Sequence, residues 1–472
     1  MQIQRAAIAS IAYLAGEPRG RQIVEHITAC ITDGRLAPGV RLPPIRELSG
    51  LLQVSKSTVV EALDRLRAAG LLTARQGAGY YVARDALASA RPEPVTSTAP
   101  APDILATLRQ ALMLDNGTRR PGCGFLPAAW LPDQELMKAM RGTLRASALR
   151  MGEYGAVPGY LPLRQTLRHK LAALGIQAGT GQIVTTASTV QAVDMLLQLL
   201  LQPGDTALLD EPGYVNFRAA LTLRGARVVS VPRSREGLDF AALERLLGSE
   251  RPRVYLTNST LHNPTGHSFS VLQAQRLLEL CQRFAVQVIE DDIYCDLQPD
   301  APRLAALGGL ARVSYVSGFS KTLSANCRVS YAVVEAQLAE RLQALKLTSG
   351  AVTSELTEQV IQRMLLEGSY ERHTRRLVDR LYESGARVSR WLAEAGCTLH
   401  STPGQGLFIW ARLPSGQEAV ALARRGLALG LVLAPGALLS QAPDACHFMR
   451  FNVGHSDSQV VRDAFLRLLE GR

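Results

Sequence analysis

The string Ser317-Gly-Phe-Ser-Lys321-Thr-Leu-Ser-Ala-Asn-Cys-Arg328 decides how the larger part of this 472-residue chain is interpreted. It follows the apolar run Val313–Val316, so it predicts a lysine in a small-residue turn after a strand. The lysine suits a covalent bond with an aldehyde, and the arginine suits bidentate binding of a phosphate. A Ser-Lys pair alone carries almost no information, because most lysines are solvated surface residues, but the full string is much more specific.

Two strings upstream of this lysine end predicted strands in polar side chains. Glu290-Asp291-Asp292-Ile293-Tyr294 follows the apolar run Val286–Ile289. Ligands bind at the carboxyl ends of strands in parallel sheets. The alternative is a solvated acidic loop or a magnesium site. The apolar run that leads into the acidic residues makes an ordinary surface loop less favoured. His262-Asn263-Pro264-Thr265-Gly266 follows another strand, and taken alone it indicates only a turn.

Three further segments supply donors and an aromatic ring. Thr185–Ala192 opens a helix after a strand, and the N–H groups and hydroxyls of a helix N-terminus suit a phosphate. Tyr214 in Glu211-Pro-Gly-Tyr offers a stacking ring, and Arg450 suits a carboxylate. Together these groups meet the needs of pyridoxal phosphate (PLP), which requires a lysine, a carboxylate at its pyridine nitrogen, phosphate donors and a covering ring.

Short apolar runs alternate with longer helical stretches through this part of the chain. We expect strands at Thr206–Leu209, Arg227–Val231, Val254–Thr257, Val286–Ile289, Val313–Val316 and Ser330–Val334, and helices at Thr189–Leu201, Phe240–Leu247 and Val271–Arg283. This alternation predicts an α/β domain with a mostly parallel sheet covered by helices.

The N-terminal part predicts three short helices followed by a hairpin. Arg19–Asp33 carries isoleucines at helical spacing, Pro43-Pro44 precedes a second helix, and Gly70 ends a third. Leu71–Thr73 and Tyr80–Val82 form the expected hairpin. This is the layout of a winged helix-turn-helix, whose third helix enters the major groove of DNA. A small helical dimerisation unit is the alternative.

The segment from about Gly20 to Val82, with LPPIRELSGLLQVSKSTVVEALDRLRAAGLLTARQGAGYYV, closely resembles the DNA-binding domain of the GntR family of bacterial regulators. The resemblance implies that DNA is contacted by Arg46, Lys56, Ser57, Thr58, Gln76 and Gly77. Val60 stands where many relatives carry an arginine, so one phosphate contact is expected to be missing.

From about Phe125 to Val453, the order and spacing of the strings resemble class I/II aminotransferases of fold type I. The resemblance implies three catalytic residues: Lys321 for the Schiff base, Asp291 for the pyridine nitrogen and Tyr294 for the phenolate oxygen. It also implies contacts from Asn263 to the phenolate oxygen, from Tyr214 to the ring, from Ser188, Thr189, Ser320 and Arg328 to the phosphate, and from Arg450 to the substrate carboxylate. Tyr154 matches a tyrosine that reaches the neighbouring subunit's phosphate, which implies a homodimer. Gly318, where Ser or Thr is usual, and Val190, where a polar ligand is common, depart from the pattern.

The whole layout resembles the MocR subfamily of GntR-type transcription regulators. We expect a winged helix-turn-helix with a short extension in residues 1–87, a proline-containing linker at 88–102, and an aminotransferase-like PLP-binding domain at 103–472. The implied function is a PLP-dependent DNA-binding regulator that senses PLP and/or an amino acid or amine through an external aldimine. The alternatives are an active aminotransferase of amino acids with an attached helix-turn-helix, and a protein that has lost PLP and only dimerises.

Composition limits the other possibilities. The net charge of +11 permits double-stranded DNA as a partner, although charge alone does not establish it. The seven cysteines are odd in number and form no C-x-x-C pair, which argues against disulfides or structural zinc and favours a reducing cytoplasm. No apolar run reaches about 18 residues, so we expect no membrane-spanning helix.

Overall fold

The computed structural model describes residues 8–11, 13, 18–75, 79–83, 104–113, 118–146, 152–350, 352–400 and 406–471. Contacts between Cα atoms divide the chain into two compact units, Met1–Ala101 and Pro102–Arg472. The predicted linker at 88–102 and the predicted DNA contacts Gln76 and Gly77 lie outside the described residues. The finer boundaries expected from the sequence therefore stay a prediction.

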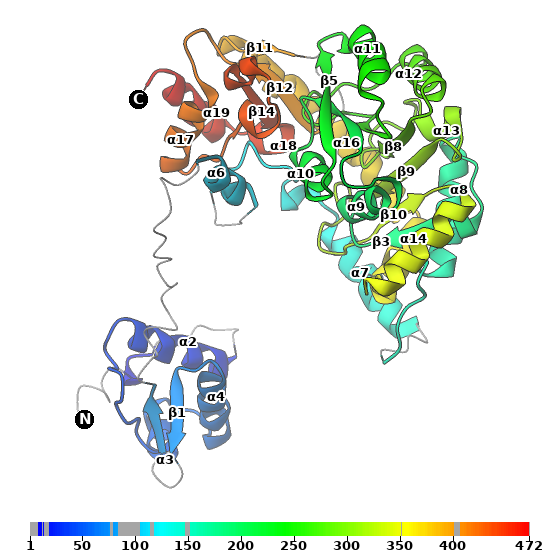
Figure 1. The fold of residues 1–472 in the computed structure, drawn as a ribbon. Coiled ribbons are helices and arrows are strands. Elements are labelled where there is room, and N and C mark those ends of the chain that lie inside the picture. The colour runs from blue at the N-terminus through cyan, green and yellow to red at the C-terminus, as the bar shows by residue number, and fades with distance from the viewer. Residues whose placement is uncertain are drawn as a thin grey trace. The chain divides into compact units, whose positions relative to one another are not determined.

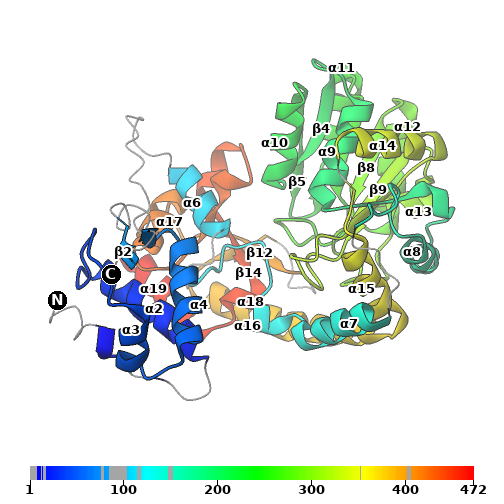
Figure 2. The same cartoon turned by 90° about the horizontal axis from the view of Figure 1, so that it is seen from below.

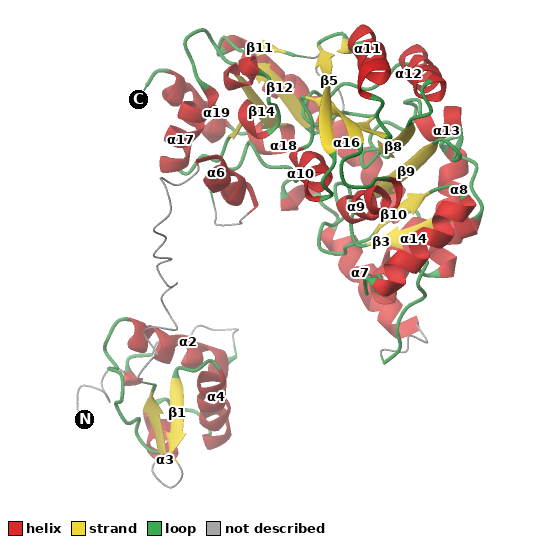
Figure 3. Cartoon of the chain, in the orientation of Figure 1, coloured by secondary structure: helices red, strands yellow, loops and turns green. Residues whose placement is uncertain are grey.

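The smaller unit packs helices against a two-stranded hairpin (Figures 1 and 3). Its elements are α2 (Arg19–Thr32), α3 (Ile45–Leu51), α4 (Lys56–Ala68), β1 (Leu72–Arg75) and β2 (Gly79–Val82). Ile23 and Ile27 lie on one face of α2, since residues three to four apart lie on the same side of a helix. This face shares a buried core with Leu63 of α4. The predicted three helices and hairpin match this unit, with the first strand shifted by one to two residues.

The larger unit is built on an eight-stranded sheet of order β3-β10-β9-β8-β7-β4-β5-β6. The five strands from β9 to β5 are parallel, whereas β10 runs antiparallel to both β3 and β9, and β6 runs antiparallel to β5. The prediction of a mostly parallel sheet is confirmed. The strands are β3 (Ile183–Thr186), β4 (Thr206–Glu211), β5 (Arg227–Ser234), β6 (Gly237–Leu238), β7 (Val254–Asn258), β8 (Gln287–Asp291), β9 (Val313–Gly318) and β10 (Ser330–Val333).

Helices cover both faces of this sheet (Figure 3). Successive side chains of a strand point to opposite faces, so Leu208 and Tyr255 enter one core while Ala207 and Val254 enter the other. The first core contains α8 (Leu161–Ala173), α11 (Phe240–Glu250), α12 (Val271–Arg283) and α13 (Leu304–Gly308), and the second contains α9 (Thr189–Leu200), α10 (Val215–Leu223) and α14 (Ala336–Thr348). Burial on both faces explains why these strands read as continuous apolar runs.

The larger unit also contains a separate four-stranded antiparallel sheet, of order β11-β12-β14-β13. Its core joins Phe451 of β14 to Trp391 of α16 and Phe465 of α19. The strands are β11 (Thr398–Leu399), β12 (Phe408–Arg412), β13 (Ala434–Pro435) and β14 (Phe448–Asn452), with α6 (Ile104–Met113), α16 (Ser369–Glu394), α17 (Ala419–Ala428), α18 (Val453–Ser456) and α19 (Gln459–Leu469).

Two more helices, α7 (Asp133–Ala146) and α15 (Glu355–Leu366), lie side by side, as Figure 2 shows. None of the helices in the described ranges is both long and apolar enough to cross a membrane. Within the same ranges, no group of His, Cys, Asp or Glu is arranged to hold a metal ion. All seven cysteines are free thiols.

Candidate functional site

Lys321 lies in the turn that follows β9, with its amine in a closed environment. Nζ donates a hydrogen bond of 2.8 Å to the carbonyl oxygen of Gly124 and lies 4.6 Å from the centroid of the Phe125 ring. Burial, helped by the positive charge of Arg450, lowers the pKa of the Lys321 amine to about 8. With that pKa, roughly a tenth of the amine is unprotonated at pH 7, which suits a nucleophile.

Asp291 ends β8 with a buried carboxylate that lacks a full set of partners. Its Oδ1 is enclosed and accepts no hydrogen bond in the described structure. Burial, followed by the charge of neighbouring Asp292, raises the pKa of Asp291 to about 8, although Lys321 acts in the opposite direction. A buried oxygen without a donor is rare in folded proteins. It fits a ligand that brings a cationic N–H group, as the protonated pyridine nitrogen of PLP does.

Arg450 of β14 connects two parts of this site. Its Nη1 donates to Asn263 Oδ1 at 2.9 Å, and its Nη2 donates to the carbonyl oxygen of Gly122 at 2.6 Å. The guanidinium also lies over the Phe408 ring, 4.5 Å from the centroid. Because Arg450 occupies the amide oxygen of Asn263, the amide nitrogen of Asn263 is the group left to face an acceptor. Nε of Arg450 has no partner among the described residues.

Tyr294 and Tyr214 supply two aromatic rings near these groups. Tyr294 is buried, stands edge-on to Phe408, and has its pKa raised by burial and by the charge of Asp291. Its hydroxyl therefore stays a proton donor at any physiological pH. The hydroxyl of Tyr214 accepts a hydrogen bond of 2.8 Å from Asn216.

One pocket brings four of the predicted residues together. Lys321, Asn263, Tyr214 and Arg450 line it, and they come from the turns after β9, β7 and β4 and from β14. Parallel strands deliver their carboxyl ends to one edge of a sheet, which explains why residues distant in sequence meet here. Asp291 and Tyr294 are buried close to these groups but do not line the pocket itself.

The predicted phosphate residues lie outside the lining of this pocket. Ser188 caps α9, and its Oγ accepts a hydrogen bond of 3.0 Å from Gln191 N, so its hydroxyl proton stays available. Thr189 is buried in the first turn of α9, and Ser320 is half-buried beside Lys321. Arg328 is exposed with a φ of 53°, and Tyr154 is 96% exposed. The structure does not place Tyr154 against the Lys321 pocket of its own chain.

Part of the pocket wall consists of residues that the sequence did not indicate. Arg109, Leu112 and Met113 of α6 line the pocket, together with Gly124 and Phe125. The amphipathic pattern of α6 predicts a helix but gives no sign of which face meets a ligand. Only the tertiary contact of α6 with β13 and α17 shows it.

The predicted DNA-binding surface begins where α4 begins. Ser55 is the N-cap of α4, and its Oγ accepts a hydrogen bond from Thr58 N at 3.2 Å. Lys56 and Ser57 are exposed in the first turn, Thr58 is half-buried, and Arg46 is exposed on α3. The start of α4 therefore presents a cation and small hydroxyl side chains, as a helix that enters the major groove requires.

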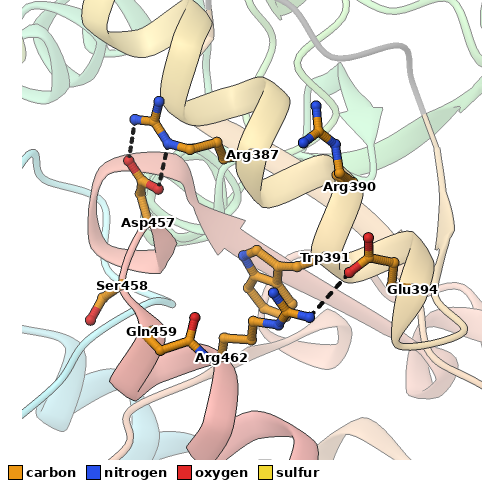
Figure 4. Close-up of a pocket in the computed structure, with 8 residues that line it drawn as sticks. All are labelled: Arg387, Arg390, Trp391, Glu394, Asp457, Ser458, Gln459 and Arg462. Carbon is orange, nitrogen blue, oxygen red and sulfur yellow. Dashed lines mark hydrogen bonds and ion pairs between the residues drawn. The ribbon is translucent and has the colours of Figure 1, made fainter.

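A second pocket lies between the end of α16 and the start of α19 (Figure 4). Arg387 pairs with Asp457 at 2.7 Å, and Arg462 pairs with Glu394 at 3.1 Å. Since both acidic groups in the lining are neutralised by arginines, we interpret this pocket as a structural junction that ties α16 to the α18–α19 turn.

Comparison with known proteins agrees with the fold. Residues 129–463 match the family model of class I and II aminotransferases, and residues 19–82 match that of the gntR family of bacterial regulatory proteins. The chain therefore belongs to the class I/II aminotransferase family. It is a GntR-type regulator with the MocR arrangement, in which the helix-turn-helix domain is fused to an aminotransferase-like domain whose cofactor is PLP.

The relatives fall into regulators and enzymes. The chain is 28% identical to the uncharacterized HTH-type transcriptional regulator YdfD of Bacillus subtilis, over 96% of this chain and 95% of the relative. It is 30% identical to the 2-aminoadipate transaminase of Thermus thermophilus, over 77% and 92%. The solved α-aminoadipate aminotransferase LysN of Thermus thermophilus, complexed with N-(5'-phosphopyridoxyl)-L-leucine, has a TM-score of 0.68 at 26% identity, over 77% of this chain and 97% of that one.

Proposed function

We propose that this regulator senses PLP and/or an amino acid or amine in its larger unit, and that the ligand alters how its helix-turn-helix holds DNA. The observation that carries the proposal is the half-buried Lys321, whose amine has a lowered pKa, together with the buried Asp291, whose Oδ1 lacks a donor. Both features fit PLP, and the same chain carries the exposed start of a recognition helix. A ligand transmits a signal only if it favours one arrangement of the protein over another.

In this proposal each residue has one role. Lys321 holds the cofactor covalently, Asp291 keeps the pyridine nitrogen protonated, and Asn263 and Tyr294 donate to the phenolate oxygen. PLP, when bound, supplies an electron-accepting ring. Tyr214 covers that ring. The phosphate is held by Ser188, Thr189, Ser320 and Arg328, and Tyr154 reaches the phosphate of a second subunit, which makes a homodimer part of the proposal.

Arg450 is proposed to bind the carboxylate of the effector. Its buried guanidinium has an unused Nε and already holds Asn263, so an arriving carboxylate would meet a positioned donor. DNA is proposed to be contacted by Arg46, Lys56, Ser57 and Thr58, with Gln76 and Gly77 of the wing. Since the target is chromosomal DNA, we propose the cytoplasm as the location.

Gel-shift titration with upstream DNA tests the regulatory role. The titration is run with PLP-loaded protein, with and without a panel of amino acids that includes 2-aminoadipate, on which a relative acts. We expect salt-sensitive, sequence-preferring binding whose affinity changes with one amino acid of the panel. Absence of any preferred promoter sequence would contradict the proposal.

An active aminotransferase is the second candidate, supported by the combination of Lys321, Asp291, Asn263, Tyr294 and Arg450. The two functions differ in turnover. A spectral change that stops after one equivalent of amino acid favours the sensor, whereas repeated turnover with a keto acid favours the enzyme.

Lys56→Ala is expected to weaken binding to the preferred duplex by roughly 10-fold at physiological salt, because it removes one cation from the DNA surface. The slope of log K against log salt should fall by about one. Fluorescence anisotropy at several salt concentrations measures both quantities. Lys138→Ala, which removes an exposed lysine of α7 in the other unit, is the matched charge control. Parallel salt plots for Lys56→Ala and the unchanged protein would show that Lys56 does not contact the duplex.

The rate at which cofactor-free protein takes up PLP is expected to rise with pH and to level off above about 8. Only the unprotonated Lys321 amine attacks an aldehyde, and burial lowers its pKa to about 8. The rate should therefore increase by about 10-fold from pH 6 to 7, since each pH unit below the pKa changes the free amine by that factor. Stopped-flow absorbance follows the bound cofactor. A rate that keeps rising to pH 10 would show an unperturbed lysine.

A further inference from the structure

We propose that Ser330 donates a hydrogen bond to the phosphate of PLP and so replaces the hydroxyl that is missing at Gly318. This inference rests on the proposed cofactor site and adds to it a residue that the sequence pattern did not indicate. Ser330 opens β10, is 1% exposed, and its Oγ is buried without any hydrogen-bond partner in the described structure.

A buried hydroxyl without a partner destabilises the folded state, because folding removes its hydrogen bonds to water and no protein group replaces them. Native proteins rarely retain such groups unless a ligand or an unseen water satisfies them. The neighbours of Ser330 in the sheet show which ligand group would do so.

The sheet register places Ser330 between the strand ends that lead into the predicted phosphate residues. Ser330 of β10 pairs directly with Gly318 of β9 on one side and with Thr186 of β3 on the other. Ser320 follows Gly318 by two positions, Ser188 follows Thr186 by two, and Arg328 precedes Ser330 by two. All three chain segments that supply the predicted phosphate donors therefore converge on Ser330.

The pairing with Gly318 explains why glycine stands where the family usually has Ser or Thr. Directly paired residues of antiparallel strands project on the same face of a sheet. A Cβ built on Gly318 would lie 2.6 Å from Ser330 Cβ and 2.9 Å from its Cα, closer than side-chain atoms approach. Ser330 thus fills the space that a side chain at position 318 would occupy. In this chain the hydroxyl that the family carries at position 318 of β9 is supplied by Ser330, the directly paired residue of β10.

Ser330→Ala in the full-length protein tests this role. Cofactor-free protein is titrated with PLP and, separately, with pyridoxal, which lacks the phosphate, and bound cofactor is followed by absorbance. We expect the dissociation constant for PLP to rise roughly 10- to 100-fold, as for loss of a hydrogen bond to a charged group, with that for pyridoxal unchanged. The melting temperature of the cofactor-free variant should be equal or higher, since an unpaired hydroxyl is removed.

The control is Ser389→Ala, which removes another buried serine whose Oγ has no partner, in α16. It should leave the ratio of the PLP and pyridoxal constants unchanged. The double variant Gly318→Ser/Ser330→Gly returns the hydroxyl to the other strand and should recover PLP affinity to within about threefold of the unchanged protein.

Three outcomes would overturn the inference: unchanged PLP affinity in Ser330→Ala, equal weakening of PLP and pyridoxal, or a double variant as weak as Ser330→Ala. Failure of the proposed function looks different. In that case the unchanged protein itself gives no bound cofactor on titration with PLP.

Discussion

Lys321→Ala is expected to abolish the covalent attachment of PLP completely. In the structure the Lys321 amine lies beside the carbonyl of Gly124 and the ring of Phe125, with its pKa lowered to about 8. Among the residues that the structure describes, no other lysine lines the pocket. Borohydride reduction followed by peptide mass spectrometry should therefore find a cofactor adduct on the Lys321 peptide of the unchanged protein and none on the variant.

The control for this result is Lys138→Ala, in which an exposed lysine of α7 is lost and the adduct should be retained in full. A yellow Lys321→Ala protein with an intact response of DNA binding to ligand would contradict the cofactor site. Only a DNA-binding protein with an unknown trigger would then remain.

Arg303→Met is expected to lower the free energy of unfolding of the larger unit by about 3–5 kcal/mol, because it breaks a buried ion pair and leaves Asp292 uncompensated. Arg303 Nε donates to Asp292 Oδ2 at 2.9 Å, and both side chains are at most 1% exposed. Arg303 Nη2 also donates to the carbonyl oxygens of Cys295 and Gln298, at 3.0 and 2.8 Å. The loop that carries Tyr294 thus depends on this arginine.

Denaturant titration followed by tryptophan fluorescence measures this effect in the larger unit alone, since the three tryptophans, Trp130, Trp391 and Trp410, all belong to it. Arg424→Met on α17 is the control, because Arg424 is exposed and has no ion pair among the described residues. It should change the free energy of unfolding by less than about 0.5 kcal/mol. A similar small change in Arg303→Met would show that Asp292 is neutralised by other means.

Much of the fold could be predicted because many of its strands and helices have local sequence signals, such as apolar runs and capping residues. The sequence predicts the helix Val271–Arg283 with the bounds that the structure shows, and the N-cap Ser270 precedes it. The strand predicted at Val313–Val316 continues to Gly318 in the structure. Both faces of that strand are buried, so its apolar run is unbroken, and such runs are the clearest strand signal.

The small antiparallel sheet could not be predicted in the same way. β11 and β13 have two residues each, too short for any periodic pattern. Its longest strands, β12 and β14, mix aromatic residues with arginines, and only their mutual pairing buries Trp410 beside Phe448.

The residues of the candidate site also differ in whether the sequence could indicate them. Residues carried by specific strings, such as Lys321 and Asn263, were found from the sequence and do line the pocket. Arg109 and Ser330 were missed, because the position of one depends on how α6 docks and the role of the other on which strands become neighbours.

The docking of α6 brings the beginning of the larger unit to the candidate cofactor pocket. α6 is the first described helix of the larger unit, and its residues Arg109, Leu112 and Met113 line the candidate cofactor pocket. A ligand that occupies this pocket would therefore contact the helix that stands first in the larger unit, the next described element after the winged helix-turn-helix in the sequence.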